Sequence, residues 1–379
     1  MKENNIPLKT WRKAELRDLL FTIAPPIKLN TSEYLVDGKY PIVDQGKNKI
    51  VGYTNNDAAV LYNLPAVIFG DHTKEVKFIN FPFAVGADGV KILDSDELEK
   101  TYLKFVIENA VKYLPDLGYS RYFSELKNVV IAFPSKAEQK AIAKILSTVD
   151  AVIHITEIMI AQKELRKKWL MQQLLTGRKR LKGFENTKWK MQPLENFIKP
   201  IVREVPKPDV PYIGIGLRSH GKGTFLKHDE QPEKNSMDNF YVVRPNDLIV
   251  NITFAWEQAI AIVRPEDDGA LASHRFPTYT FIEEKGHPDF FRFFILQARM
   301  KFMLEIISPG GAGRNRVMSK SDFIKLEFLL PEYKEQTAIA QVLQAADKEI
   351  SLLKLKAEKL REKKKGLMQQ LLTGKIRVK

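Results

Sequence analysis

Apolar residues recur every seven positions in two long stretches of the chain, residues 134–177 and 331–374. This spacing is typical of a helix that packs along one seam of a coiled coil. The seam of the second stretch consists of Ile339, Ala346, Leu353, Leu360 and Leu367 on one side and of Leu343, Ile350, Ala357, Lys364 and Leu371 on the other. Five such heptads predict a helix of roughly 60 Å at a rise of about 1.5 Å per residue.

The first stretch has the same seam, but three of its positions are polar. Thr156, Lys163 and Lys167 stand where apolar residues are expected, so the partner of this helix must tolerate polar groups. Both stretches begin with proline and end with Thr-Gly, which are common start and stop signals of helices. The segment 147–150 has N-cap character, so the sequence allows either one continuous helix or a break that separates a short first helix.

The two stretches are copies of each other. Glu-Gln at 138–139 aligns with Glu-Gln at 335–336, and the eight residues LMQQLLTG at 170–177 are repeated without change at 367–374. Two unrelated surface helices would not share such a run. A repeat of this kind indicates two equivalent halves, and the simplest arrangement is an antiparallel pair of helices that holds two globular halves a fixed distance apart.

Short apolar runs separated by Gly, Asn and Asp fill the rest of the chain and predict sheets with tight connections. In the first segment we expect strands at 40–43, 50–53, 66–70, 76–78, 83–85, 90–93 and 129–133, and helices at 11–20 and 98–113. In the second segment we expect strands at 212–215, 247–250, 259–263, 278–281 and 326–330, and a helix at 290–307. The interiors of the two segments share almost no sequence.

The predicted fold class is α+β. Two globular α/β domains are separated by two long helices that form an antiparallel coiled coil, with an internal pseudo-two-fold repeat. The predicted boundaries are a first domain at 1–133, a central helical region at 134–178, a linker at 179–188, a second domain at 189–330 and a distal helical region at 331–379.

Composition adds a compartment and a class of partner. The 379 residues contain no cysteine, which favours a reducing, cytoplasmic setting. The sequence has no signal-peptide pattern and no run approaching 18 apolar residues, so we expect no membrane association. The formal net charge of +14 indicates a polyanionic partner, nucleic acid first, although lysine runs are also common on solvated surfaces.

Motifs for catalysis are missing from the sequence. It contains no P-loop pattern, and Gly310–Gly313 does not stand between a strand and a helix as a dinucleotide fingerprint must. The six histidines lack metal-ligand spacing. Nuclease-like fragments such as Glu75-Val76-Lys77 recur by chance in so charged a chain. We therefore expect no catalysis by this chain alone, no metal site and no cofactor.

Polar loops hinged by glycine are the candidates for reading DNA, because base edges and phosphates are contacted by Arg, Lys, Asn, Ser and Thr. The first segment offers Lys47, Asn48, Thr54, Asn55, His72, Thr73, Lys74, Tyr119 and Arg121. The second segment offers Arg218, Ser219, His220, Lys222, Trp256, His274, Arg275, Arg314, Asn315 and Arg316. The run Gly310–Arg316 is the most persuasive, since glycines beside two arginines allow close approach to a phosphate.

These motifs together resemble the specificity subunit of type I restriction–modification enzymes over the full length. The repeated Pro-x-x-x-Glu-Gln-x-Ala-Ile-Ala at 134–143 and 331–340, each followed by LMQQLLTG, carries most of the likeness. The segments at 53–55, 68–73 and 83–89 resemble one group of target recognition domains in that family.

The resemblance implies two target recognition domains that each read one half of a split double-stranded DNA sequence. The helices would measure the unread spacer and dock two methyltransferase subunits, with restriction subunits joining them. S-adenosylmethionine, ATP and Mg²⁺ would belong to these partners. One helical turn inserted after Thr176 is expected to lengthen the spacer.

Other readings remain open. The same architecture would suit the specificity subunit of a fused restriction–methyltransferase polypeptide (type IIB-like). A coiled-coil scaffold could bind nucleic acid without reading its sequence, and steep salt dependence without sequence preference would reveal it. A metal-dependent nuclease would cut DNA as the purified chain.

Overall fold

The computed structural model describes residues 11–86, 88–118, 120–311 and 316–378. The chain divides into two compact units, one formed by Met1–Met159 with Leu353–Lys379 and the other by Ile160–Leu352. Each unit combines a globular domain with the beginning of one long helix and the end of the other.

The first domain contains three small sheets. Their strand orders are β1-β11, β2-β10-β7-β8 and β3-β9-β4-β5, with β6 paired to β9. The strands are β1 (Arg12–Glu15), β2 (Phe21–Ile23), β3 (Lys28–Leu29), β4 (Tyr40–Val43), β5 (Gly52–Thr54), β6 (Val60–Leu61), β7 (Ala66–Gly70), β8 (Val76–Ile79), β9 (Phe83–Gly86), β10 (Val90–Asp94) and β11 (Val130–Phe133). The helices are α1 (Leu16–Leu19), α2 (Lys100–Ala110) and α3 (Phe123–Lys127).

The second domain repeats this plan. Its sheets have the orders β12-β22, β13-β21-β18-β19 and β14-β17-β20-β15-β16. The strands are β12 (Lys190–Pro193), β13 (Ile198–Ile201), β14 (Glu204–Pro206), β15 (Tyr212–Leu217), β16 (Thr224–Glu230), β17 (Asn239–Val242), β18 (Leu248–Val250), β19 (Ile260–Ile262), β20 (Leu271–Ala272), β21 (Thr278–Phe281) and β22 (Glu327–Leu330). The helices are α5 (Pro288–Phe294), α6 (Ala298–Ile306) and α7 (Lys320–Ile324).

The two four-stranded sheets correspond strand for strand, although their sequences do not. In each sheet, the strand that comes first in the chain (β2 or β13) pairs antiparallel with the strand that comes last (β10 or β21). That last strand also pairs with the strand that opens the hairpin between them (β7–β8 or β18–β19). The internal repeat therefore includes the domains as well as the helices. Two expected helices are wrong in detail: residues 11–20 are mainly the strand β1 and the four-residue helix α1, and residues 290–307 are divided between α5 and α6.

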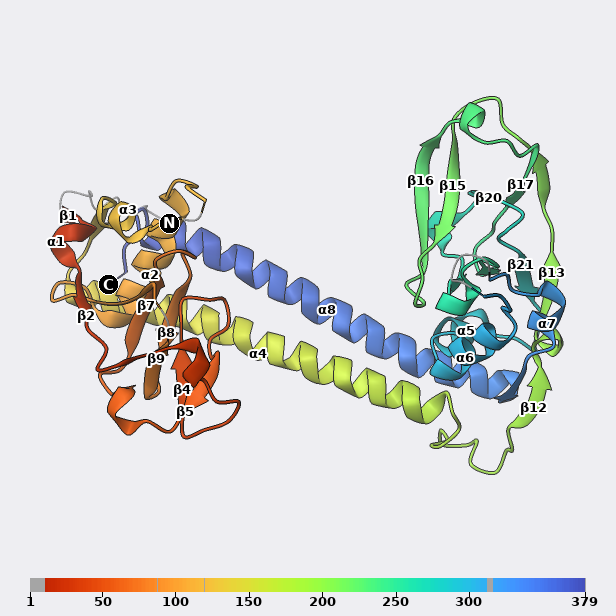
Figure 1. Ribbon diagram of the computed structural model, residues 1–379, viewed down its shortest axis with the longest axis horizontal. Coiled ribbons are helices and arrows are strands. Elements are labelled where there is room, and N and C mark those ends of the chain that lie inside the picture. The colour runs from red at the N-terminus through yellow and green to blue at the C-terminus, as the bar shows by residue number, and fades with distance from the viewer. Residues whose placement is uncertain (1–10, 87, 119, 312–315, 379) are drawn as a thin grey trace, which may run out of the picture. The chain divides into compact units, whose positions relative to one another are not determined.

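The two long helices are α4 (Lys136–Leu174) and α8 (Tyr333–Leu371), and each is continuous (Figure 1). The break considered at 147–150 is absent, so that alternative was wrong. Every predicted seam residue of both helices is buried or half-buried. Between 151 and 170, only the six seam positions of α4 are not exposed, which confirms the heptad pattern; they are Ile153, Thr156, Ile160, Lys163, Lys167 and Leu170.

Lysines in the seam form ion pairs with carboxylates of the opposite helix. In the second unit, Lys167 of α4 pairs with Asp347 of α8 at 2.5 Å. In the first unit, Lys364 of α8 pairs with Asp150 of α4 at 2.7 Å, which is the same pair exchanged between the two copies. Residues later in α4 pair with residues earlier in α8. The two helices therefore run antiparallel in both units. These pairs explain why lysines are tolerated in the seam.

Each domain core includes residues from both long helices. Ile142 and Leu146 at the start of α4, together with Met368 and Leu371 at the end of α8, belong to the core of the first unit. Leu174 at the end of α4 and Leu175 directly after it belong, with Ile339 and Leu343 of α8, to the core of the second. The LMQQLLTG run therefore ends each helix inside the unit that the other helix begins.

A clasp of glutamate, arginine and tryptophan closes each unit, and we call it the Glu–Arg–Trp clasp. In the second unit, Arg180 donates to both carboxylate oxygens of Glu335 at 2.7 and 2.6 Å, and the indole of Trp189 donates to the same carboxylate at 3.0 Å. In the first unit, Arg377 donates to both oxygens of Glu138 at 2.7 Å and lies 5.6 Å from the ring centroid of Trp11. Both arginines stand three residues after the final glycine of LMQQLLTG.

The glutamine of the repeated Glu-Gln pair fastens the long helix to its domain. Gln139 accepts a hydrogen bond from the backbone N–H of Glu99, the N-cap of α2, at 2.7 Å. Gln336 accepts one from His287, the N-cap of α5, at 2.9 Å. Both glutamines are almost fully buried, and their amide groups also donate to nearby carbonyls. The repeated sequence is therefore explained by the repeated joint it forms.

Acid is expected to weaken the first unit through Glu138. Hydrogen bonds from Arg377 hold the pKa of Glu138 below its ordinary value. A carboxylate whose pKa is lower in the folded state stabilises fully above its unfolded pKa, near 4.3, and loses this contribution as the pH falls through the folded value. Glu138→Gln should therefore flatten the fall in the urea midpoint between about pH 5 and pH 3. An equally steep fall in Glu138→Gln would contradict the assignment.

One face of α4 remains apolar and exposed. Its residues are Val152, Ile155, Ile158, Met159, Leu165 and Trp169. By length and composition alone, α4 is also long and apolar enough to cross a membrane, a possibility that was not expected from the sequence. Only 11% of its most apolar 18-residue window is buried. Its seam nevertheless packs against α8 through paired charges, and a helix that docks a protein partner would have the same composition.

Candidate DNA-reading surfaces

Three of the predicted loops in the first unit form one hydrogen-bonded group, which we call the first loop cluster: residues 44–49, 71–75, 116–118 and 120–122, the last two ranges belonging to one loop. Gln45 is its centre. Its side chain accepts from the backbone N–H of His72 at 3.1 Å, and its carbonyl accepts from the hydroxyl of Thr73 at 2.5 Å. Nδ1 of His72 lies 3.0 Å from the carbonyl of Ser120, which ties in the third loop.

A buried lysine shapes this cluster from below. The ammonium of Lys77, on β8, donates to the carbonyls of Asp44 and Asn48 at 2.7 and 2.6 Å. Burial lowers the pKa of Lys77, which is only 8% exposed. Because its donors are used by two carbonyls of one loop, the loop is held in a single conformation. Sequence reasoning missed Lys77, and its place inside an apolar strand was the available signal.

The side chains that the first loop cluster presents to solvent are mostly those predicted. Lys47, Asn48, Thr73 and Arg121 are exposed. Lys74 is half-buried, with its ammonium 4.4 Å from the ring centroid of Tyr122 and 3.7 Å from the carboxylate of Asp116.

Two predicted residues lie elsewhere in the first domain, and one lies outside the described residues. Thr54 is 5% exposed, and its hydroxyl accepts a hydrogen bond from the backbone N–H of Asn56. Asn55 accepts from the backbone N–H of Lys39. No hydrogen bond among the described residues joins either of them to the first loop cluster. Tyr119 is not described.

Three predicted loops of the second unit meet, together with Arg316 at the end of the fourth, in a second loop cluster: residues 218–223, 251–258, 273–276 and 316–320. Ser219 donates to the carboxylate of Glu257 at 2.5 Å, and the backbone of His220 donates to the carbonyl of Glu257 at 2.7 Å. The backbone of Ile252 joins the third and fourth loops, because its N–H donates to Arg275 and its carbonyl accepts from Met318. Chain segments far apart in sequence thus form one surface.

The cationic residues of the second loop cluster differ in how they are held. Arg218 donates to the carbonyl of Thr224 at 2.7 Å and lies 4.9 Å from the ring centroid of Phe225. Arg316 lies 5.3 Å from the ring centroid of Trp256, which fixes both side chains on one surface. His220, Lys222, His274 and Arg275 are exposed. Arg314 and Asn315 lie outside the described residues.

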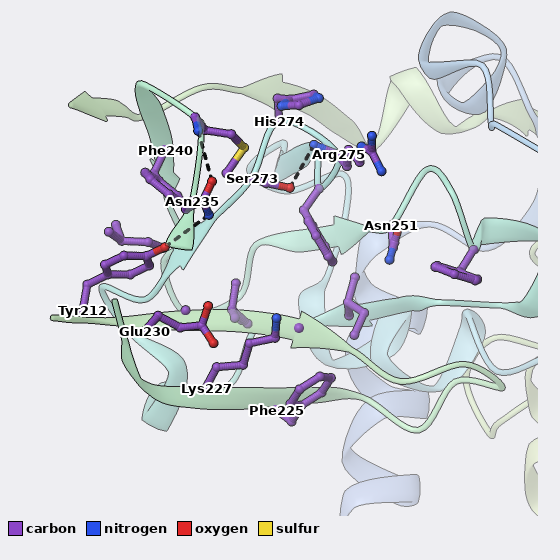
Figure 2. Close-up of a pocket in the computed structure, with 18 of the residues that line it drawn as sticks. Tyr212, Phe225, Lys227, Glu230, Asn235, Phe240, Asn251, Ser273, His274 and Arg275 are labelled. Atoms are coloured by element: carbon purple, nitrogen blue, oxygen red, sulfur yellow. Dashed lines mark hydrogen bonds between the residues drawn. The ribbon is translucent and has the colours of Figure 1, made fainter. Parts of the chain in front are cut away.

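A cavity of about 600 Å³ adjoins this cluster, between the β15–β16 hairpin and the loop 273–276 (Figure 2). Ser219, His274 and Arg275 line it, and Lys227 and Asn251 were not predicted from the sequence. Asn251 directly follows the buried strand β18. A polar residue directly after a buried strand could have been recognised in the sequence as a candidate site residue. Among the described residues, no group of three or more His, Asp or Glu side chains is placed to hold a metal ion.

Comparison with known proteins places this geometry in a family. Residues 8–164 and 199–362 match the family model described as type I restriction modification DNA specificity domain. A type I restriction enzyme specificity subunit of Methanocaldococcus jannaschii, MjaX, is 27% identical over 311 residues, which cover 76% of this chain and 70% of the relative. The MjaVIII specificity subunit of the same organism is 23% identical over 377 residues, covering 92% and 86%.

Solved structures agree at the level of the fold. The S subunit of a type I restriction–modification system from M. genitalium is 15% identical, has a TM-score of 0.61, and covers 98% of both chains. The HsdS subunit from Thermoanaerobacter tengcongensis is 14% identical, with a TM-score of 0.51 over 99% of this chain and 100% of that chain.

Proposed function

Because this chain belongs to the family of type I restriction modification DNA specificity domains, we propose that it gives a restriction–modification complex its target sequence by reading two separated half-sites. Each unit would read one half. Catalysis would belong to partner subunits that carry S-adenosylmethionine, ATP and Mg²⁺. The complex would act on double-stranded DNA in the cytoplasm.

The observation that carries this proposal is the pair of loop clusters. Each unit gathers loops from distant parts of its domain into one surface with exposed amide and cationic side chains. Amides and guanidinium groups read base edges, and ammonium groups hold phosphates. Equivalent scaffolds with different loop sequences are what two different half-sites require.

Docking of the catalytic subunits would use the long helices. The exposed apolar face of α4 is a surface that water does not favour, and such patches mark protein interfaces. Since the scaffold repeats internally, two copies of one methyltransferase subunit could bind equivalent faces, and restriction subunits would join them. The helices would also set the length of the unread spacer.

Methylome mapping tests the proposal. The chain would be expressed with the methyltransferase subunit of its own system in a host that lacks DNA methylation, and methylated adenines would be mapped across the genome. We expect a single motif with two defined halves and an undefined gap. A soluble complex that yields no motif would contradict the proposal, and salt-sensitive binding without sequence preference would favour a non-specific scaffold.

Substitutions in one loop cluster should relax one half-site only. Arg121→Ala is expected to change the first half of the motif, and Arg275→Ala the second half, because each arginine is exposed in a different unit. Loss of a base contact costs about 1–3 kcal/mol of discrimination at one position. Motif maps of both variants would show it, with Arg299→Ala on α6, outside the second loop cluster, as the control. Relaxation of both halves by one substitution would contradict the division of labour.

A further inference from the structure

The cavity beside the second loop cluster is large enough to hold a small molecule. Its volume of about 600 Å³ is within the range of roughly 300–1,000 Å³ that is usual for small-molecule sites. It extends from the second loop cluster along β15 and β16 to Tyr212 and Phe240 (Figure 2). Gly214 and Gly216 of β15 line it without contributing side chains of their own.

Aromatic side chains form much of its wall. They are Tyr212, Phe225, Phe240, Phe254 and Phe276. The ring of Phe225 packs on the bare backbone of Gly216, where an added Cβ would come within 2.4 Å of the ring. The rings of Tyr212 and Phe240 lie 5.1 Å apart at the other end. Aromatic faces of this kind stack with nucleobases.

A buried amide points its unused donors at this space. Asn251 is 9% exposed, and its side-chain carbonyl accepts from the backbone N–H of Thr253 at 3.0 Å. That bond fixes which end of the amide is turned to the protein. The Nδ2 group has no hydrogen-bond partner among the described residues and lines the cavity. These donors are open to the cavity and are free to bind an acceptor on a ligand.

Charges at the rim complete the chemistry. Arg275 and Lys227 line the cavity, and neither forms an ion pair among the described residues. Glu230 lines it as well and supplies an acceptor. The set therefore combines flat apolar faces, amide donors and two cations, which match the faces, the polar edge and the phosphate of a nucleotide.

We propose that this cavity binds a nucleotide, with its base between the aromatic walls, its polar edge at the amide of Asn251 and its phosphate at Arg275 or Lys227. The nucleotide has two possible sources. It is either a base of the second half-site turned out of the duplex, in which case the inference rests on the proposed function, or a free nucleotide.

Three substitutions make the test. Asn251→Asp keeps the acceptor that Thr253 needs and removes the two donors that face the cavity. Lys227→Gln removes an exposed cation at the rim, and Lys199→Gln removes an equally exposed cation on β13 that does not line the cavity. Urea unfolding of each full-length variant establishes that it folds as the natural chain does.

The DNA source is tested with the complex of the chain and its methyltransferase subunit. Duplexes carry 2-aminopurine or pyrrolocytosine at one position of the second half-site at a time. We expect a fluorescence change at a single position that is not a methylated adenine, lost in Asn251→Asp and kept in Lys199→Gln. The free source is tested by equilibrium dialysis of the full-length chain with ATP and the four deoxynucleoside monophosphates. Saturable binding that Asn251→Asp weakens about ten-fold would support it.

Absence of both signals overturns the inference. A fluorescence change that Asn251→Asp leaves intact would overturn the DNA source, because that base would be unstacked by another part of the complex. These outcomes are distinct from failure of the proposed function, which would appear as a missing bipartite motif in the methylome of the natural chain.

Discussion

Glu335→Ala is expected to lower the free energy of unfolding of the second unit by about 3–5 kcal/mol, the usual loss when one partner of a buried ion pair is removed. The side chain of Glu335 is 2% exposed and receives two hydrogen bonds from Arg180 and one from Trp189. Its removal leaves a largely buried guanidinium and an indole N–H without their acceptor. Urea unfolding of the full-length chain would measure the loss.

The matched control is an ion pair in the same unit that water already screens. Arg244 and Asp268 pair at 3.1 Å, with side chains that are 53% and 49% exposed. Asp268→Ala should therefore cost about 0–1 kcal/mol. A loss below about 1 kcal/mol for Glu335→Ala would show that the Glu–Arg–Trp clasp does not hold the end of α4 to the start of α8.

Lengthening both long helices should move the methylated motif to a longer gap and abolish methylation of the original target. Seven residues inserted after Met159 in α4 and after Leu352 in α8 keep the heptad phase and add about 10 Å to each helix. At about 3.4 Å per base pair, the unread spacer should grow by roughly two to three base pairs, with both half-sites unchanged. Methylome mapping would read all three features at once.

The insertion must lie inside the long helices, because only there does it lengthen a helix. An insertion after Thr176 would fall beyond the last residue of α4 and would lengthen a turn instead of a helix. Seven residues inserted after Gly183, in the exposed linker, make the control and should leave the spacer as it is. The original spacer in an active double-insertion variant would contradict the idea that the helices set the gap.

The joints between helices and domains could have been found in the sequence but were not. Arg180 and Arg377 stand at the same distance after the two LMQQLLTG runs, and Trp11 and Trp189 begin the two domains. The repeat thus extends beyond the two helical stretches that share long runs of sequence. These additional repeated positions are single residues in otherwise different sequence. Only their contacts with Glu138 and Glu335 show that they form the same clasp in both units.

The two loop clusters could be predicted in part from the sequence, for a physical reason. Polar loops hinged by glycine are visible in sequence, and most of those residues lie in the two loop clusters. The burial of Thr54 at the end of β5 depends on the packing of that strand, which residue type alone does not indicate. Lys77 and Asn251 were missed because a buried polar group is defined by its partners, which come from distant strands.

The sequence by itself determined the two long helices, their seam, the internal repeat and the family. These follow from periodicity and identity, which are properties of neighbouring positions along one chain. Only the tertiary structure decided that the two domains share a strand order despite unlike sequences, that the seam lysines pair with Asp150 and Asp347, and that seven distant loops meet as two surfaces. Such features depend on contacts between residues far apart in the chain, and many different sequences can supply them.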